Sequence, residues 1–160
     1  DKDMAQCVRE DGRVVTFNRR EGRFFDADGV AEKFGVRPAS IPDYLALVGD
    51  SADGFPGLPG WGAKSAAVVL ERYAHLEAIP DSVSAWDLKV RGAASLARAL
   101  QEGRAEALLF RELATLRVDA PIAQTEPEQL RWRGVDREAF EAMAARLRSP
   151  RLLERLPARG

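Results

Sequence analysis

A glycine- and proline-rich segment, residues 54–62, constrains the fold of this chain more than any other feature. Pro59 presets φ for a turn, and Gly60 and Gly62 place backbone at positions that a side chain would obstruct. We therefore predict a tight hairpin over residues 58–62 that opens directly onto a helix. One face of that helix is expected to be buried, because apolar residues recur at i, i+3, i+4 and i+7 in Ala66, Val69, Leu70 and Tyr73.

The first turn of this helix carries Lys64 and Ser65. A lysine at this position is unfavourable, because the N-terminal end of the helix dipole is positive. The arrangement becomes favourable when an anion such as a phosphate docks against the helix N-terminus. We expect Gly60, Gly62, Lys64 and Ser65 to contact a phosphate backbone. The plain alternative is a surface loop that only caps a helix.

Two pairs of aspartates accompany the hairpin. Asp50 and Asp53, at i and i+3, are expected to share one face of a turn. Asp1 and Asp3 are two residues apart, so in an extended segment both would point to one face and could share a cation. Carboxylates suit hard divalent cations such as Mg²⁺. A metal site beside a phosphate site indicates an enzyme that acts on a nucleic-acid backbone, although an isolated Asp-x-Asp pair is usually solvated.

Three sequence stretches resemble one protein family: residues 41–48, Gly49-Asp50-Ser51-Ala52-Asp53, and Leu58 to Ala67. The last resembles a helix-hairpin-helix motif, and together they resemble the structure-specific 5′ nucleases. That family includes bacterial 5′→3′ exonucleases, the nuclease domain of DNA polymerase I and flap endonucleases. The likeness extends from Asp1 to about Pro121. The sequence departs from the family at Gly54, where relatives usually carry Asn, and at Trp61, where a smaller aliphatic residue is usual.

The resemblance implies a site and a reaction. Asp1, Asp3, Asp50 and Asp53 match the acidic cluster of the family, which holds two Mg²⁺ or Mn²⁺ ions for phosphodiester hydrolysis. Asp50 and Asp53 would then act catalytically through the metal. Relatives also bind a K⁺ ion through hairpin carbonyls, here in the region 58–62, and that ion meets a DNA phosphate.

The resemblance also implies the substrate and the setting. The substrate is expected to be duplex DNA with a free 5′ end or a 5′ flap, cut during replication and repair, in the cytoplasm at the bacterial nucleoid. A DNA polymerase is the expected partner, in cis or in trans. Two other classes remain open: a non-catalytic helix-hairpin-helix DNA-binding module, and an interaction domain whose helical half docks a polymerase.

The expected fold is mainly α with a short β-hairpin near the N-terminus, next to an α/β PIN-like core that is largely absent from this chain. We expect residues 1–35 to form the edge of that core, 36–120 the DNA-binding region and 121–160 C-terminal helices. Asp28 is predicted to cap a helix over 29–34. Short helices are predicted over residues 4–8 and 76–79. Longer predicted helices begin at Pro42, Ala63, Ala93, Ala105 and Asp136, the fourth with Ala105, Leu109, Leu113 and Leu116 on its buried face.

Composition restricts the class of protein but does not indicate a function. A single cysteine excludes an internal disulfide and fits a reducing compartment, and Cys7 is expected to be buried. His75 is interpreted as a helix-end residue rather than a ligand. No apolar run is long enough for a membrane span. The net charge of −1 neither supports nor opposes DNA binding, although residues 131–160 hold eight arginines against four acidic residues. The first residue is not Met, and we expect the C-terminal part of a longer protein.

Overall fold

The computed structural model describes residues 1–156, which form two compact units, Asp1–Val118 and the unit that begins at Asp119. The fold is mostly helical with one two-stranded antiparallel sheet near the N-terminus, which confirms the predicted class. The α-helices and strands of the first unit are β1 (Thr16–Asn18), β2 (Arg23–Phe25), α1 (Ala27–Phe34), α2 (Ile41–Val48), α3 (Ala63–Tyr73), α4 (Ala93–Glu102) and α5 (Arg104–Ala114). Its 3₁₀ helices are η1 (Asp3–Cys7), η2 (Pro38–Ser40), η3 (Leu76–Ala78) and η4 (Val83–Ala85).

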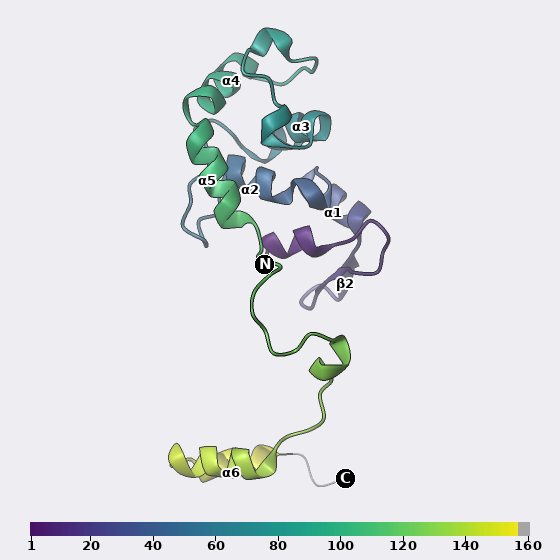
Figure 1. The fold of residues 1–160 in the computed structure, drawn as a ribbon, viewed down its shortest axis with the longest axis vertical. Coiled ribbons are helices and arrows are strands. Elements are labelled where there is room, and N and C mark those ends of the chain that lie inside the picture. The colour runs from purple at the N-terminus through teal and green to yellow at the C-terminus, as the bar shows by residue number, and fades with distance from the viewer. Residues whose placement is uncertain (157–160) are drawn as a thin grey trace. The chain divides into compact units, whose positions relative to one another are not determined.

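Helix α2 lies at the centre of the first unit and packs against both α5 and α3 (Figure 1). A helix that is apolar on most of its sides must be buried by its neighbours. Pro42 occupies its first turn, as predicted, and Gly49 follows its last residue in a left-handed region of φ. Its fully buried apolar residues are Ile41, Leu45, Ala46 and Leu47.

A charged residue of α2 is buried as deeply as these apolar ones. The carboxylate of Asp43 accepts hydrogen bonds from the Leu76 backbone N–H at 3.1 Å and from Arg111 Nη1 at 3.2 Å. Its other oxygen lies 2.9 Å from His75 Nδ1. Arg111 also bonds Glu77 at 2.6 Å, and its guanidinium holds the pKa of the Glu77 carboxyl below the usual range. This network joins α2, the segment after α3, and α5. His75 lies at a helix end, as expected.

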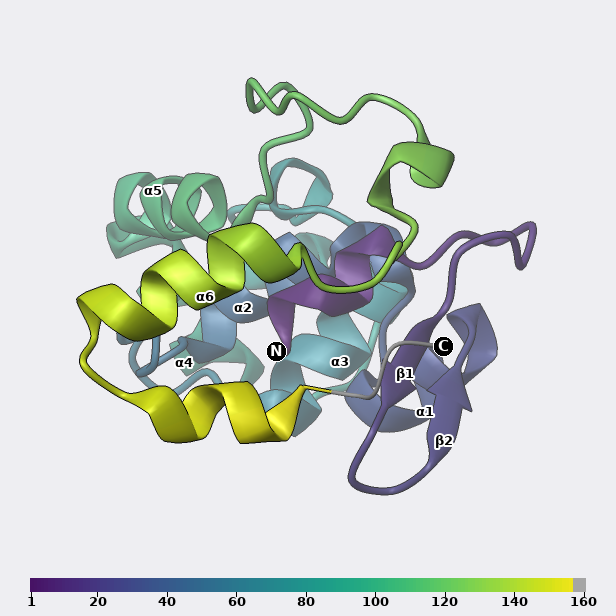
Figure 2. The same ribbon diagram turned by 90° about the horizontal axis from the view of Figure 1, so that it is seen from below.

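The β-hairpin and α1 form a second group of elements (Figure 2). Strand pairing joins Thr16 to Phe25 and Asn18 to Arg23. The N-cap of α1 is Asp26, whose Oδ1 accepts from the Gly29 N–H at 2.8 Å, so the prediction that Asp28 caps this helix was wrong. Both aspartates suit a cap by residue type, but only Asp26 has the extended backbone of an N-cap residue.

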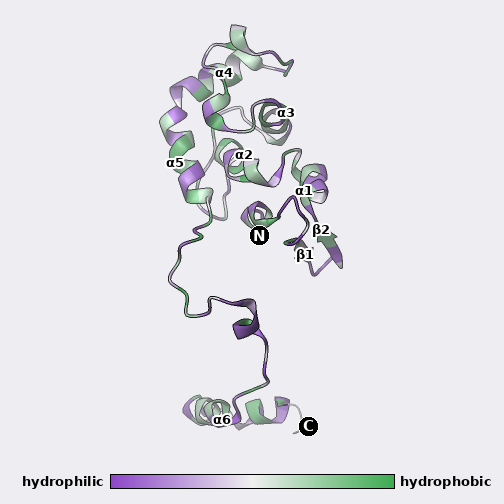
Figure 3. Cartoon of the chain, turned by 45° about the vertical axis from the view of Figure 1, so that its right-hand side comes forward, coloured by the Kyte–Doolittle hydropathy of each residue, from purple (hydrophilic) through white to green (hydrophobic). Residues whose placement is uncertain are grey.

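Helix α5 buries a different face from the one predicted. Ala107 and Ala114 are buried and Phe110 packs against the core, whereas Leu109 and Leu113 are 52% and 62% exposed. Figure 3 shows hydrophobic and hydrophilic residues alternating along this helix. Both faces have helical spacing, but the chosen face carries small residues for close contact with α2, and it also carries Arg111, which pairs with Asp43.

The second unit contains η5 (Pro127–Leu130), α6 (Arg137–Arg146) and η6 (Pro150–Arg155). Asp136 caps α6 as predicted, because its Oδ1 accepts from the Ala139 N–H at 3.0 Å. Of the apolar residues of α6, Ala144 is buried and Met143 is exposed. Within residues 1–156, no helix combines the length and the apolar character needed to cross a bilayer.

We predict that Asp43→Ala lowers the free energy of unfolding by about 3 kcal/mol, because it leaves the Leu76 N–H and one bond of Arg111 without their buried acceptor. Urea denaturation followed by circular dichroism measures the change. Glu102→Ala is the matched control: it removes a carboxylate from an exposed pair with Arg98 and is expected to have no measurable effect. Equal stability of the Asp43→Ala and Glu102→Ala variants would contradict the role given to Asp43.

Candidate functional site

Four of the candidate residues, Asp50, Asp53, Gly60 and Gly62, lie in the loop between α2 and α3, residues 49–62, which doubles back on itself. The Asp50 N–H donates to the Phe55 carbonyl at 2.9 Å, and the Phe55 N–H donates to the Asp50 carbonyl at 3.2 Å. At the base of the loop, Gly49 and Gly57 approach so closely that a Cβ on Gly57 would lie 2.5 Å from the Gly49 nitrogen. Both have positive φ, so only glycine fits at either position.

The hairpin beyond this base is a type II turn. The Trp61 N–H donates to the Leu58 carbonyl at 3.2 Å, with Pro59 and Gly60 at the two central positions. Gly60 has φ of +78°, which the third residue of such a turn requires. The Leu58 N–H also donates to the Leu47 carbonyl of α2 at 2.9 Å. The turn predicted over residues 58–62 is therefore present, and its tip, Pro59 and Gly60, is exposed.

Trp61, one of the two departures from the family pattern, anchors the hairpin to α4. Its side chain is buried, and its Nε1–H donates to the Leu96 carbonyl at 3.2 Å. Its ring also lies near that of Trp86, with the ring centroids 6.4 Å apart. Trp61 thus attaches the hairpin to α4, while the tip of the hairpin stays exposed to solvent.

The N-terminus of α3 follows the hairpin directly. Gly62, the N-cap residue, has φ of −143°, an extended conformation that any residue adopts, so its backbone needs no glycine. No heavy atom lies within 4 Å of a Cβ built on Gly60 or Gly62, so both positions face open space. The Ser65 hydroxyl accepts from the Gly62 N–H and donates to the Gly62 carbonyl, both at 3.0 Å. Lys64 is exposed and forms no ion pair with a carboxylate of residues 1–156.

The four candidate carboxylates have different surroundings. Asp50 is 1% exposed; its Oδ1 accepts from the Ala52 N–H at 3.1 Å and lies 3.0 Å from the Lys2 ammonium. Its Oδ2 is buried without a hydrogen-bond partner. Asp53 is exposed. Asp1 and Asp3 do not lie in the extended segment that would put both on one face, because Lys2 has helical torsions and η1 begins at Asp3.

A divalent cation therefore has one suitable buried oxygen, the free Oδ2 of Asp50, and Lys2 already brings a positive charge to the other oxygen. The remaining aspartates do not complete a set of ligands. Within residues 1–156, no three His, Cys, Asp or Glu side chains gather closely enough to hold a metal ion. The carboxylates of Asp1 and Asp3 each accept the N–H of the next residue, at 2.9 Å.

The pairing of Lys2 with Asp50 was not predicted from the sequence. The position of Lys2 between two aspartates was the only available signal, and nothing local connects it with Asp50, which lies 48 residues further along the chain. Cys7 was expected to be buried, but it is exposed, because Ala5 and Val8 of the same segment face the core instead.

Comparison with known proteins gives consistent similarities. The profile of a family described as 5′-3′ exonuclease, C-terminal SAM fold, matches residues 36–138. DNA polymerase I of Pseudomonas aeruginosa is 42% identical over 130 residues, which cover 76% of this chain and 13% of that protein. A 5′-3′ exonuclease of Buchnera aphidicola is 32% identical over 123 residues, which cover 76% of this chain and 42% of that protein. This chain thus spans less than half the length of these relatives.

The fold is also similar to that of a solved structure. The crystal structure of the T5 D15 protein, co-crystallised with metal ions, superposes with a TM-score of 0.53 at 21% sequence identity. The match covers 71% of this chain and 39% of that one. At this identity the similarity concerns the fold alone.

We predict that Lys2→Met lowers the free energy of unfolding in metal-free buffer by about 1 kcal/mol, because the buried Asp50 carboxylate loses its counter-charge. The half-exposed position of the lysine side chain limits the loss. Thermal denaturation in the presence of a chelator measures it, with Lys89→Met as a control at an exposed lysine that has no ion pair. If the two variants melt alike, Lys2 is not the counter-charge of Asp50.

Proposed function

We propose a function from one premise: this chain belongs to the 5′-3′ exonuclease family, within its C-terminal SAM fold. The whole protein would hydrolyse DNA phosphodiesters as a structure-specific 5′→3′ exonuclease or flap endonuclease. This chain would supply the part that holds duplex DNA with a 5′ end or a 5′ flap.

One observation carries the proposal: the open backbone of the hairpin tip and the α3 N-terminus, beside an unpaired lysine. The first N–H groups of a helix have no intrahelical acceptor, and no side chain caps those of α3. Gly60 and Gly62 leave space in front of them, and Lys64 adds a positive charge. A phosphate would accept hydrogen bonds from these N–H groups. Contacts of this kind position DNA without reading its sequence.

The rigid base of the loop favours this role. The Gly49–Gly57 approach and the Trp61 anchor hold the hairpin before any ligand arrives, so little conformational entropy is lost on binding. We also propose a K⁺ ion at the carbonyls of residues 58–62, where it would meet the same phosphate.

The metal dependence is proposed from the family as well. Asp1, Asp3, Asp50 and Asp53 would hold Mg²⁺ or Mn²⁺, with Asp50 and Asp53 acting through the metal. When bound, such ions neutralise charge on the phosphate and make a water nucleophilic. Asp50 offers the buried oxygen that suits a cation, whereas the other three would need to approach it.

A DNA polymerase in cis is the proposed partner, because the Pseudomonas relative is named DNA polymerase I and extends far beyond the matched region. The alternative function is a non-catalytic helix-hairpin-helix module, which would use the hairpin but not the aspartates. A measurement of metal binding distinguishes the nuclease from the non-catalytic module.

We predict that Lys64→Ala weakens duplex binding about equally on all sequences and lowers the slope of log K against log salt by roughly one unit. Gly62→Val should weaken binding further, because the branched side chain fills the space that the DNA backbone would use. The extended φ of Gly62 accommodates valine, so the helix should be retained. Fluorescence anisotropy at several salt concentrations measures both, with Lys89→Ala as the control. An unchanged slope and affinity in both variants would exclude the hairpin as the DNA contact.

We predict that Mn²⁺ raises the melting temperature of the chain and that Asp53→Asn reduces this gain, because a ligand that binds the native state stabilises it by mass action. Asp53 is exposed, so the substitution should leave the fold intact. Differential scanning calorimetry with and without Mn²⁺ gives both shifts, with Asp136→Asn as a control that retains a good helix cap. An equal gain in the Asp53→Asn variant and the unmodified chain would show that Asp53 is not a ligand, and no gain in either would favour the non-catalytic module.

A further inference from the structure

The positive charges of the first unit fall into two groups. Most of its arginines form an ion pair with a carboxylate within the unit. Arg19, Arg20 and Lys33 form no ion pair with a carboxylate of residues 1–156. The paired arginines are Arg9, Arg13, Arg23, Arg37, Arg72, Arg98, Arg104 and Arg111.

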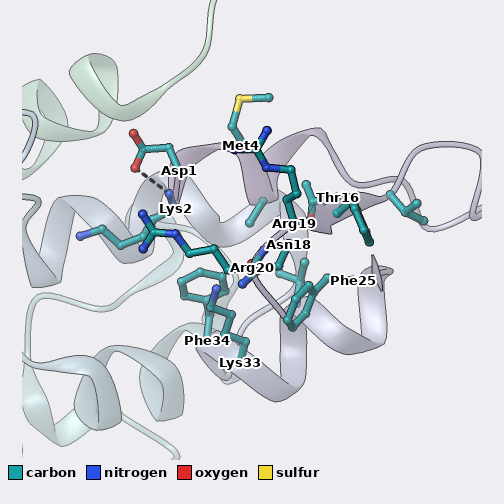
Figure 4. A pocket seen from close by; sticks show the side chains of 14 residues that line it. Asp1, Lys2, Met4, Thr16, Asn18, Arg19, Arg20, Phe25, Lys33 and Phe34 are labelled. Carbon is teal, nitrogen blue, oxygen red and sulfur yellow. Dashed lines mark hydrogen bonds between the residues drawn. The ribbon is translucent and has the colours of Figure 1, made fainter. Parts of the chain in front are cut away.

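These three unpaired cations line one cavity of about 720 Å³ (Figure 4). We call it the hairpin pocket; its walls come from η1, the β1–β2 hairpin and α1. Lys2, a fourth cation in its lining, is already paired with Asp50. The one acidic residue in the lining, Asp1, already accepts the Lys2 N–H at 2.9 Å. The pocket therefore has an excess of positive charge that the described chain does not neutralise.

Local contacts hold the backbone turn that carries Arg19 and Arg20, and they orient the Lys33 side chain. The Asn18 side chain accepts the N–H of Arg20 at 3.0 Å and that of Glu21 at 3.3 Å, so the turn that carries the two arginines is held in one conformation. The Lys33 ammonium lies over the rings of Phe25 and Phe34, at 5.1 Å and 5.3 Å from their centroids. Such contacts orient the lysine without removing its charge.

The C-terminal end of α1, whose Lys33 and Phe34 line the pocket, packs against α3. Gly35, which ends α1 two residues after Lys33, packs against α3 so closely that a Cβ there would lie 2.6 Å from the Ala67 Cβ. Ala67 and Lys64 are three residues apart and share a face of α3. The end of α1 with Lys33 therefore lies beside the turn of α3 that carries Lys64.

We propose that the hairpin pocket is a second phosphate-binding site, in which Arg19, Arg20 and Lys33 hold the backbone of a nucleic acid that continues from the α3 N-terminus. The inference rests on the proposed function, since it extends the same DNA path. The positively charged pocket suits an anionic ligand such as a phosphodiester. A guanidinium group binds phosphate oxygens with paired hydrogen bonds, and each such contact releases counterions that were condensed on the nucleic acid. The path would join the tip of the α2–α3 hairpin to the β1–β2 turn.

The test is the salt dependence of DNA binding by the variant Arg19→Gln/Arg20→Gln. Because this variant lacks two cations that would each bind a phosphate, its slope of log K against log salt should be lower by about two units. Arg98→Gln is the matched control, because it also removes an exposed arginine charge, but one that Glu102 already neutralises; its slope should not change. Lys33→Gln, on a different element, should lower the slope by about one unit. The substituted side chains project from an exposed turn and a helix surface, and circular dichroism verifies the fold.

Duplex and single-stranded DNA of equal length form the two arms of the experiment. A lower slope with either arm supports the site and identifies the form of the strand that it holds. Unchanged slopes in both the double variant and Lys33→Gln, with either DNA, overturn the hairpin pocket. If Lys64→Ala still lowers the slope in that case, the proposed function stands and this inference alone fails. An unmodified chain that binds neither DNA would overturn both.

Discussion

The first unit depends most on the hydrogen bonds and the ion pair that the buried Asp43 carboxylate makes. Asp43 lies on the innermost helix, α2, and ties that helix to α5 through Arg111 and to the segment after α3 through the Leu76 N–H. A buried charge is costly unless every lone pair finds a donor. This requirement fixes which face of α5 turns inward, and the small residues Ala107 and Ala114 then allow close contact with α2.

The loop that follows α2 is held in place by contacts with this buried helix and with α4. Its base closes where Gly49 meets Gly57, and the Leu58 N–H bonds the Leu47 carbonyl at the end of the buried helix. Trp61 then attaches the turn to α4. The hairpin is thus held from three sides by groups that face the core, while its tip and the first turn of α3 stay exposed. A contact surface built this way is organised before its ligand arrives.

Charge is distributed with a similar division of roles. Arginines that pair with carboxylates connect elements, as Arg104 does by donating to the Leu76 and Ile79 carbonyls and to Asp81. Cations without such partners among residues 1–156 include Lys64 at the α3 N-terminus and Arg19, Arg20 and Lys33 around the hairpin pocket. The net charge of −1 hides this division, because it averages neutralised and free cations together.

The sequence by itself determined the elements: the helical class, the β-hairpin, the turn at residues 58–62, the place of Pro42 in the first turn of α2 and the Asp136 cap. These follow from torsional preferences of glycine and proline and from spacing within a few residues. Only the tertiary structure decided which of two helical faces of α5 is buried and that Lys2 pairs with Asp50. Each of these depends on a partner far along the chain, and local periodicity carries no information about which distant side chain a residue will meet.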